Sequence, residues 1–285
     1  MPDTKPEFGV SSNLPEYKLS VITVNLNNAN GLLRTIESVL SQTFSSIQFI
    51  VIDGVSSDGS VEIIENHNED IHYWISEKDS GVYSAMNKGI LKAKGEYLIF
   101  LNSGDSFIDN DIVRKVFAEN ENSDIIYGYI DTPVGVRKYP EKLDVSFLAR
   151  KSLHHQATFI RKNLFDTIGL YDEKNRFESD WEFFMRAILI NKCSTYSFKH
   201  VVSFFEMGGL SSNPKLNEIK YKEKKEVIRR VMPELADWYS DYIDLHQEKR
   251  ALEAKSLGIF YRMADKITNS KLIKLLQQKR KKSNS

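Results

Sequence analysis

The chain has 285 residues, enough to bury a large core and to add an appendage to one domain. Lys and Arg together number 39, as do Asp and Glu, and 41% of the residues are hydrophobic. This composition predicts a soluble globular protein and excludes an overall charge bias toward nucleic acid. The single cysteine, Cys193, excludes an internal disulfide and a cysteine-based zinc cluster, and is typical of a reducing compartment.

The first 17 residues are polar and contain three prolines. They lack the apolar core of a signal peptide, and no later apolar run reaches membrane-spanning length. We therefore expect a loose N-terminal arm over residues 1–17 and a cytoplasmic protein.

Residues 19–101 alternate between short apolar runs, which are typical of covered strands, and segments whose apolar positions recur at helical spacing. This alternation predicts a parallel α/β sheet. The expected strands are 19–24, 47–52, 72–75 and 97–101, and the expected helices are 31–40, 60–64 and 82–93, with Gly95 placed to stop the last helix.

Carboxylates follow three of these strands, at Asp53, Asp79 and Asp105. Right-handed crossovers bring the carboxyl ends of parallel strands to one edge of the sheet, where ligands of α/β proteins gather. Each acid alone could serve only to form a turn, because Asp, Asn, Ser and Gly are all turn residues. Their recurrence at three strand ends favours a ligand site.

The second half of the chain is less regular. A helix with a sharp start is expected at Ser179, where Ser179 and Glu182 match a capping box and Asp180 falls in the first turn. The other expected elements are a helix at 111–119, strands at 124–130, 154–160 and 194–205, a short helix at 164–168 and a polar loop at 207–213.

From about Leu216 the chain reads as a helical tail broken near Pro233. Its end, residues 271–282, is basic and amphipathic. Such a segment is compatible with contact to an anionic membrane surface, and equally with a solvated helix that has a frayed basic end.

Two common nucleotide motifs are absent from the sequence. No G-x-G-x-x-G opens the first helix and no G-x-x-x-x-G-K-[ST] occurs, so neither a Rossmann dinucleotide site nor a P-loop is expected. What remains is an amide-rich loop at 25–30 and the acids at the strand ends. Carboxylates accept hydrogen bonds from ribose or base, and hard divalent ions select oxygen ligands, so the pattern suits a metal-bound nucleotide.

Several ordered segments together resemble the family 2 glycosyltransferases, which are inverting nucleotide-sugar transferases with the GT-A fold. The resemblance covers residues 18–212. It implies a mostly parallel mixed sheet flanked by helices, in a transferase domain at 18–214. The N-terminal arm at 1–17 and a C-terminal helical extension at 215–285 lie outside the resemblance and are expected from the sequence pattern. The segments that carry the resemblance are 19–25, 52–59, 79–89, 95–105, 155–159 and 179–182.

The resemblance implies a donor-binding role for nine residues. Asp53 matches the acid that recognises the base, although it could also be a turn acid before Gly54. Asn87 could equally be a helix surface residue, and the pair His154–His155 could simply cap a strand. The nine donor-binding residues implied are Thr23, Asn25, Asp53, Asp79, Asn87, Asn102, Ser103, His155 and Gln156.

Asp105 matches the last acid of the family's Asp-rich motif, which implies a Mg²⁺ or Mn²⁺ ligand at the donor diphosphate. Many members carry further acids just before it, where this chain has Asn102 and Gly104. A single protein carboxylate predicts weak metal binding in the absence of donor. Met86 stands where many relatives carry a basic residue near the base, which leaves the nucleobase open.

Asp180 matches the catalytic base, which takes the proton of the acceptor hydroxyl as that oxygen attacks the anomeric carbon. An acid in a first helical turn could instead neutralise the helix dipole. The loop Gly208 to Ser212 resembles a segment that folds over the donor and excludes water.

The resemblance thus implies a metal-dependent inverting glycosyltransferase of the hexosyl type. It would move a sugar from a nucleotide sugar, a UDP-sugar by preference, to the hydroxyl of a saccharide or lipid-linked saccharide. Relatives with this pattern build bacterial polysaccharides or glycolipids, in keeping with a cytoplasmic protein whose tail contacts the membrane. A sugar-phosphate nucleotidyltransferase is the first alternative, against which stands the absence of a glycine-rich basic triphosphate loop. A non-catalytic nucleotide-sugar-binding protein is the second, raised by Asn102 and Gly104.

Overall fold

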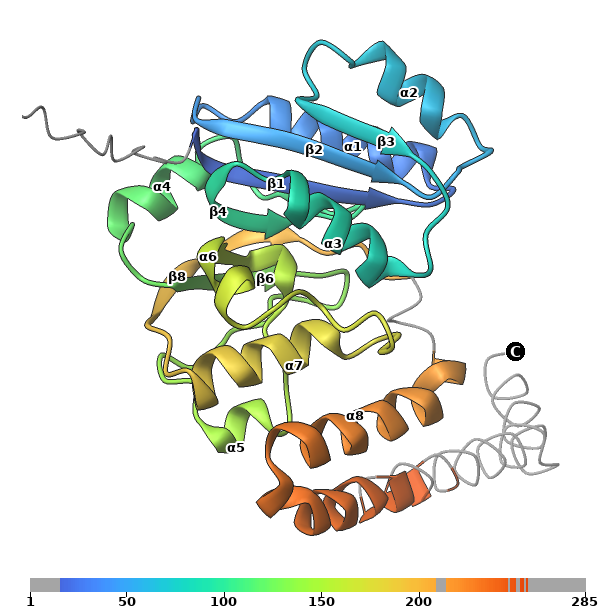
Figure 1. The fold of residues 1–285 in the computed structure, drawn as a ribbon, viewed down its shortest axis with the longest axis vertical. Coiled ribbons are helices and arrows are strands. Elements are labelled where there is room, and N and C mark those ends of the chain that lie inside the picture. Colours follow the sequence, from blue (N-terminus) through green and yellow to red (C-terminus); the bar gives the residue numbers. More distant parts are fainter. Residues whose placement is uncertain (1–15, 209–213, 246, 250–251, 254, 256–285) are drawn as a thin grey trace, which may run out of the picture. The chain divides into compact units, whose positions relative to one another are not determined.

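The computed structural model describes residues 16–208, 214–245, 247–249, 252, 253 and 255 (Figure 1). The chain divides into two compact units, Met1–Val227 and Ile228–Ser285, and only the first carries the predicted site. Residues 1–15 of the expected arm, 209–213 of the polar loop and the basic segment 271–282 lie outside the described residues. Among the residues that are described, no helix is long and apolar enough to cross a membrane.

The first unit is built on a mixed sheet of eight strands in the order β3-β2-β1-β4-β7-β6-β8-β5. Strands β3, β2, β1 and β4 run parallel, as does the pair β6–β8, whereas β7 is antiparallel to both of its neighbours. The expected mostly parallel mixed sheet is therefore confirmed. The strands are β1 Tyr17–Asn25, β2 Ile47–Asp53, β3 Tyr73–Ser76, β4 Gly95–Phe100, β5 Ser106–Phe107, β6 Ile125–Asp131, β7 Thr158–Arg161 and β8 Thr195–Phe204.

The helices follow the predicted alternation through the first half of the chain. They are α1 Ala29–Leu40, α2 Ser60–Asn66, α3 Val82–Lys92, α4 Ile112–Glu119, α5 Val145–Leu148, α6 Asn163–Thr167, α7 Ser179–Met185 and α8 Asn217–Val231. A π-helical turn, Arg186–Ile190, extends α7, and single 3₁₀ turns occupy His155–Ala157, Pro214–Leu216 and Pro233–Leu235. The expected break of the tail near Pro233 is confirmed, since α8 ends at Val231.

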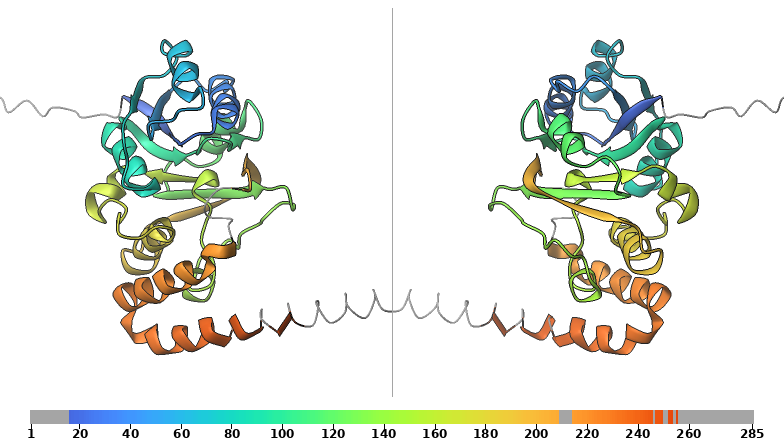
Figure 2. Two further views of the ribbon diagram at one scale, coloured as in Figure 1. Left: turned by 90° about the vertical axis from the view of Figure 1, so that its right-hand side faces the viewer. Right: turned by 90° about the vertical axis from the view of Figure 1, so that its left-hand side faces the viewer.

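Helices cover both faces of the sheet (Figure 2). Alternate β1 residues such as Leu19 and Val21 point to one face, where they join a buried cluster with residues of α1 and α4. The other face meets α3 so closely that a Cβ on Gly89 would overlap the side chain of Ile22. Because both faces are covered, the parallel strands are rich in apolar residues, and this pattern made them predictable from the sequence.

Two local predictions were wrong. Residues His155–Ala157 form a 3₁₀ turn rather than the start of a strand, because Ala157 N–H and the Thr158 hydroxyl both bond the carbonyl of His154. Ser179 is not the N-cap of α7, a position held by Glu178. The Ser179 hydroxyl instead donates to the carbonyl of Asp172 at 2.6 Å.

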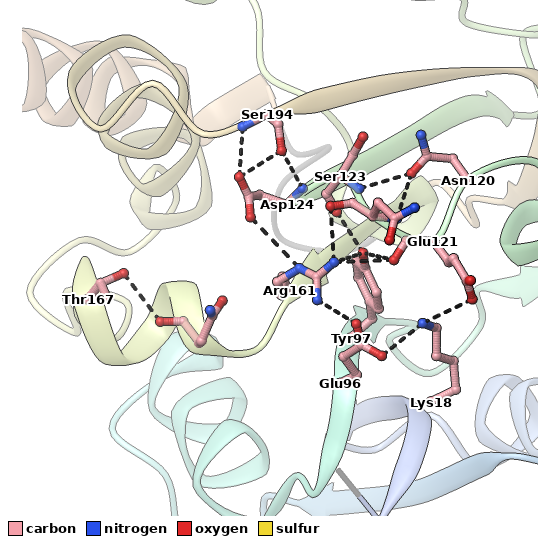
Figure 3. Close-up of polar contacts among 12 residues, drawn as sticks. Lys18, Glu96, Tyr97, Asn120, Glu121, Ser123, Asp124, Arg161, Thr167 and Ser194 are labelled. Atoms are coloured by element: carbon pink, nitrogen blue, oxygen red, sulfur yellow. Dashed lines mark hydrogen bonds and ion pairs between the residues drawn. The ribbon is translucent and has the colours of Figure 1, made fainter. Parts of the chain in front are cut away.

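The antiparallel strand β7 is fastened beside the start of β4 by Arg161 (Figure 3). Its guanidinium donates to Glu96 at 2.5 Å and to the Tyr97 hydroxyl at 2.7 Å. It also reaches the backbone carbonyls of Glu121 and Asn122. Since β7 runs opposite to β4, anchoring its end here fixes the residues that precede it at the carboxyl edge of the sheet.

Gly95 is required by the close approach of β1 and β4. It does not cap α3, whose C-cap is Ala93. A Cβ at Gly95 would lie 2.5 Å from the backbone nitrogen of Ser20 and 2.7 Å from the carbonyl carbon of Leu19. The pairing of the two central strands therefore excludes a side chain at this position.

We expect Gly95→Ala to lower the free energy of unfolding by about 1–3 kcal/mol, because the backbone of β1 must move to admit the methyl group. Urea denaturation measures this. The neighbouring control Lys94→Ala removes only an exposed ion pair with Glu16, so it should leave the free energy of unfolding almost unchanged. Equal losses in the two variants would contradict the packing argument.

Candidate active site

Asp53, at the end of β2, is fully buried and surrounded by hydrogen-bond donors. One carboxylate oxygen accepts from Asn25 at 2.7 Å and the Ser56 hydroxyl at 2.6 Å; the other accepts from Ser56 N–H at 2.9 Å and the Ser76 hydroxyl at 2.6 Å. Burial alone would raise the pKa of Asp53, but these hydrogen bonds hold it below its ordinary value. All of its acceptor positions are thus used by the protein itself.

The carboxyl end of β1, unlike Asp53, carries polar atoms that have no hydrogen-bond partner in the described part of the chain. Thr23 Oγ1 and Asn25 Oδ1 are buried and have no hydrogen-bond partner among the described residues. Asn102 Oδ1, in the loop after β4, is a third such atom. Buried polar atoms are nearly always paired, so oxygens left unpaired at one sheet edge indicate a place where a polar ligand binds.

Asp79 lies three residues beyond β3 and forms an ion pair with Lys88 of α3 at 2.6 Å. Lys88 also contacts Glu77 at 2.7 Å. Burial would lower the pKa of Lys88, yet the two carboxylates raise it above its ordinary value. Met86 is buried, and Lys88, two positions further along α3, is a positively charged residue that the sequence did not single out.

Asn87 is buried, so the reading of it as a helix surface residue was wrong. Its amide nitrogen donates to the carbonyl of Tyr171 at 2.9 Å and to Glu173 at 3.0 Å, and its oxygen accepts from Tyr171 N–H at 3.0 Å. The side chain therefore holds the segment that leads into α7.

Ser103 is held through its backbone: its carbonyl accepts a hydrogen bond from Asn28 at 2.9 Å, and its N–H donates to the carbonyl of Val24.

Asp105 is 3% exposed and lies just before β5, where it contacts the residues that precede β7 and follow β8. One carboxylate oxygen accepts from Gln156 Nε2 at 3.1 Å and the other from the backbone N–H of Glu206 at 3.0 Å. Burial raises the pKa of this carboxyl to about 7, opposed by the Gln156 hydrogen bond and by nearby His155. Gln156 therefore directly contacts the predicted metal ligand.

Asp180 lies in the first turn of α7, as predicted, and both of its oxygens are engaged. His155 Nδ1 lies 2.9 Å from Oδ2, and the Tyr83 hydroxyl lies 2.9 Å from Oδ1. Burial would raise the pKa of Asp180, but these partners hold it below its ordinary value. The carboxylate is thus ionised and oriented from two sides.

His155 connects Asp180 to the loop after β4. His155 Nδ1 lies 2.9 Å from Asp180 Oδ2, and on the other side of the ring Nε2 lies 3.4 Å from Asn102 Nδ2. Tyr83 keeps its proton, because burial and the charge of Asp180 raise its pKa well above the ordinary value. Sequence reasoning missed Tyr83 because its apolar ring belongs to the core-facing stripe of α3.

Arg34 and Glu206 form a further charged pair at this edge, with Nη2 and Oε1 2.5 Å apart. Neither residue was singled out in the sequence. They lie 172 positions apart, on α1 and just after β8, so only the folded chain brings them together. Gly104, whose φ is 106°, lies against Glu206 and has no side chain that would collide with the Glu206 carboxylate.

Comparison with known proteins supplies the family. The model of Glycosyl transferase family 2 matches residues 20–192. An uncharacterized glycosyltransferase of Mycobacterium tuberculosis is 36% identical over 204 residues, 68% of this chain and 77% of the relative. A PGL/p-HBAD biosynthesis glycosyltransferase of Mycobacterium bovis is 33% identical over 202 residues, 68% of this chain and 78% of the relative.

Solved structures with low sequence identity share the fold. TarS of S. aureus, in complex with UDP-GlcNAc, has a TM-score of 0.61 at 18% identity, over 79% of this chain and 70% of that one. The mannosyltransferase PcManGT of Pyrobaculum calidifontis, in complex with GDP-Man and Mn²⁺, has a TM-score of 0.56 at 11% identity, over 85% and 80%. With its GT-A-like mixed sheet and these relatives, the chain belongs to glycosyl transferase family 2 and is a glycosyltransferase.

Proposed function

We propose that this glycosyltransferase moves a sugar, with inversion, from a UDP-sugar to an acceptor hydroxyl in polysaccharide or glycolipid assembly. The observation that carries the proposal is the partly buried, ionised carboxylate of Asp180, held by His155 and Tyr83 at the edge where the strand-end residues gather. The complexes of TarS with UDP-GlcNAc and of PcManGT with GDP-Man support a nucleotide-sugar donor. The biosynthetic name of the mycobacterial relative supports the acceptor class.

Asp180 would act as the general base. Inverting transfer requires a carboxylate that is unprotonated and aimed before the acceptor arrives. The lowered pKa of Asp180 meets the first condition, and its contacts to His155 and Tyr83 meet the second, because they fix the plane of the carboxylate. Tyr83 keeps its own proton, so its hydrogen bond leaves the carboxylate ionised and able to accept the proton of the acceptor.

The oxygens at the end of β1 would receive the nucleotide. Thr23 Oγ1 and Asn25 Oδ1 have unused hydrogen-bonding capacity, whereas Asp53 has none. We therefore propose that Asp53 acts chiefly by fixing Asn25 and Ser56, and contacts the base only if one of these partners is exchanged. Lys88 is already paired with Asp79 and Glu77, so it would reach a donor only by exchanging one of these carboxylates.

The oxygen atoms around Asp105 suit a hard divalent cation. Asn102 Oδ1 is a buried oxygen without a partner among the described residues, and Asp105 supplies a carboxylate next to it in the same loop. Mg²⁺ or Mn²⁺ bound here would neutralise charge on the leaving diphosphate. Gln156 and the backbone of Glu206 keep the Asp105 carboxylate in place for that role. In the described part of the chain, no group of three or more His, Cys, Asp or Glu residues is arranged to hold a metal ion.

A thermal-shift panel of UDP-, GDP- and dTDP-sugars, with and without Mn²⁺, tests the donor class. We expect UDP-sugars to raise the melting temperature most, and more so with Mn²⁺, because ligands selective for the native state stabilise it by about 2.7 kcal/mol at a hundredfold excess over Kd. A larger rise in melting temperature with a GDP- or dTDP-sugar would show that the donor carries that nucleobase and not uracil. No shift with any donor would argue against a nucleotide-sugar site.

We expect Asp180→Asn to lower kcat for sugar transfer by about 10²- to 10⁴-fold while UDP binding is retained, because the amide cannot accept the proton. Asp166→Asn, at an exposed acid on α6, is the matched control and should leave kcat unchanged. Activity of Asp180→Asn equal to that of wild type would contradict the assignment of Asp180 as the base.

Pyrophosphate release from a sugar phosphate and a nucleoside triphosphate would instead identify a nucleotidyltransferase.

The hydrogen bonds to Asp53 predict a pH-dependent contribution to stability. Since its pKa is lowered in the folded protein, the ionised form stabilises the fold above the ordinary value of 3.8, and this stabilisation is lost as the pH falls through the lower folded value. Asp53→Asn should cost about 1–3 kcal/mol at pH 7. The difference from wild type should shrink at acid pH. Urea unfolding of the nucleotide-free proteins measures this, with Asp70→Asn, an exposed acid, as control. A gap that stays constant with pH would contradict it.

A further inference from the structure

The loop after β4 lacks an acid at Gly104, and the fold brings one to the same place from elsewhere. A Cβ on Gly104 would overlap the Oε2 atom of Glu206 and lie 3.1 Å from its carboxyl carbon. The Glu206 carboxylate therefore occupies the volume that a side chain at position 104 would fill.

Strand pairing explains how Glu206 reaches this place. β5 and β8 are antiparallel, with Ser106 opposite Phe204 and Phe107 opposite Ser203. Continued by two residues, the same register sets Gly104 opposite Glu206. The backbone N–H of Glu206 donates to Asp105 at 3.0 Å, which locks this register at the loop. Glu206 is thus placed by the sheet and by a buried acid, not by a free surface loop.

We propose that Glu206 supplies the second carboxylate of the divalent-cation site, in place of the acid missing at Gly104. The inference rests on the proposed function and deepens it. Asn102 Oδ1, the Asp105 carboxylate and the Glu206 carboxylate are all oxygen donors, the class that Mg²⁺ and Mn²⁺ select. Magnesium at nucleotide sites is commonly held by one or two carboxylates together with the phosphates, and Asp105 with Glu206 makes two.

Arg34 gives Glu206 a second partner and provides the means of testing its role. The ion pair uses Oε1 of Glu206, while Oε2 is the atom that faces Gly104. Both side chains are substantially exposed, at 50% and 41%, so the pair alone should contribute little to stability. If Glu206 only held Arg34, removal of either residue would have the same effect. If Glu206 binds the cation, removal of Arg34 frees a ligand and takes away a competing positive charge.

The experiment measures Mn²⁺ binding to the full chain in the presence of saturating UDP, by the electron paramagnetic resonance signal of free Mn²⁺. We expect Glu206→Gln, which keeps the side-chain volume, to weaken Mn²⁺ binding by about tenfold or more. Glu206→Asp should bind Mn²⁺ more tightly than Glu206→Gln, because it retains a carboxylate. Arg34→Gln should bind Mn²⁺ as tightly as wild type or more tightly. UDP binding without metal, measured by calorimetry, should be the same in wild type and Glu206→Gln.

The outcomes separate this inference from the function on which it rests. Wild-type affinity for Mn²⁺ in Glu206→Gln would overturn the role of Glu206 and leave the transferase proposal standing. Equal weakening in Arg34→Gln and Glu206→Gln would reduce the pair to a structural contact and overturn the inference as well. A wild-type protein that binds UDP but no Mn²⁺ would overturn both the inference and the metal dependence, and a protein that binds no UDP would remove the donor site itself.

Discussion

The buried carboxylate of Asp105 is the constraint on which the candidate site depends. A charge removed from water must be met by hydrogen-bond donors, and the fold supplies them from two distant segments, Gln156 before β7 and the backbone of Glu206 after β8. Satisfying one acid therefore fixes three parts of the chain against one another. His155, next to Gln156, is brought toward Asp180 by the same arrangement.

The antiparallel strand β7 makes this arrangement possible. Lying between β4 and β6, it carries its first residues toward the carboxyl edge and its last residue, Arg161, toward the opposite edge. The contacts of Arg161 with Glu96 and Tyr97 hold the strand at its far end (Figure 3). A network far from the site thus positions the His155–Gln156 turn, since a strand of four residues held at one end leaves little freedom at the other.

The sequence predicted what local patterns encode and missed what long-range pairing decides. The parallel strands and Asp53 at a strand end follow from apolar periodicity and were found as expected. Asp180 was placed in a first helical turn from a capping box, and it lies in that turn although the helix begins one residue earlier than expected. The N-cap at Ser179 was wrong because a tertiary hydrogen bond to Asp172 outcompeted the local one. Glu206 could not be singled out, because its placement depends on the register between β5 and β8, which no local pattern of residues specifies.

The residues predicted to bind the donor differ in whether their polar atoms are already hydrogen-bonded within the protein. Asp53 and Asn87 use their polar atoms on the protein itself, whereas Thr23, Asn25 and Asn102 each keep a buried oxygen without a partner in the described part of the chain. An unpaired buried oxygen costs free energy that a bound ligand can restore. It follows that Asp53 and Asn87 hold the frame through these contacts, and that the amide and hydroxyl oxygens of Thr23, Asn25 and Asn102 are the better candidates for direct contact with a nucleotide. Roles assigned by resemblance alone cannot make this distinction, because it depends on which partners each atom already has.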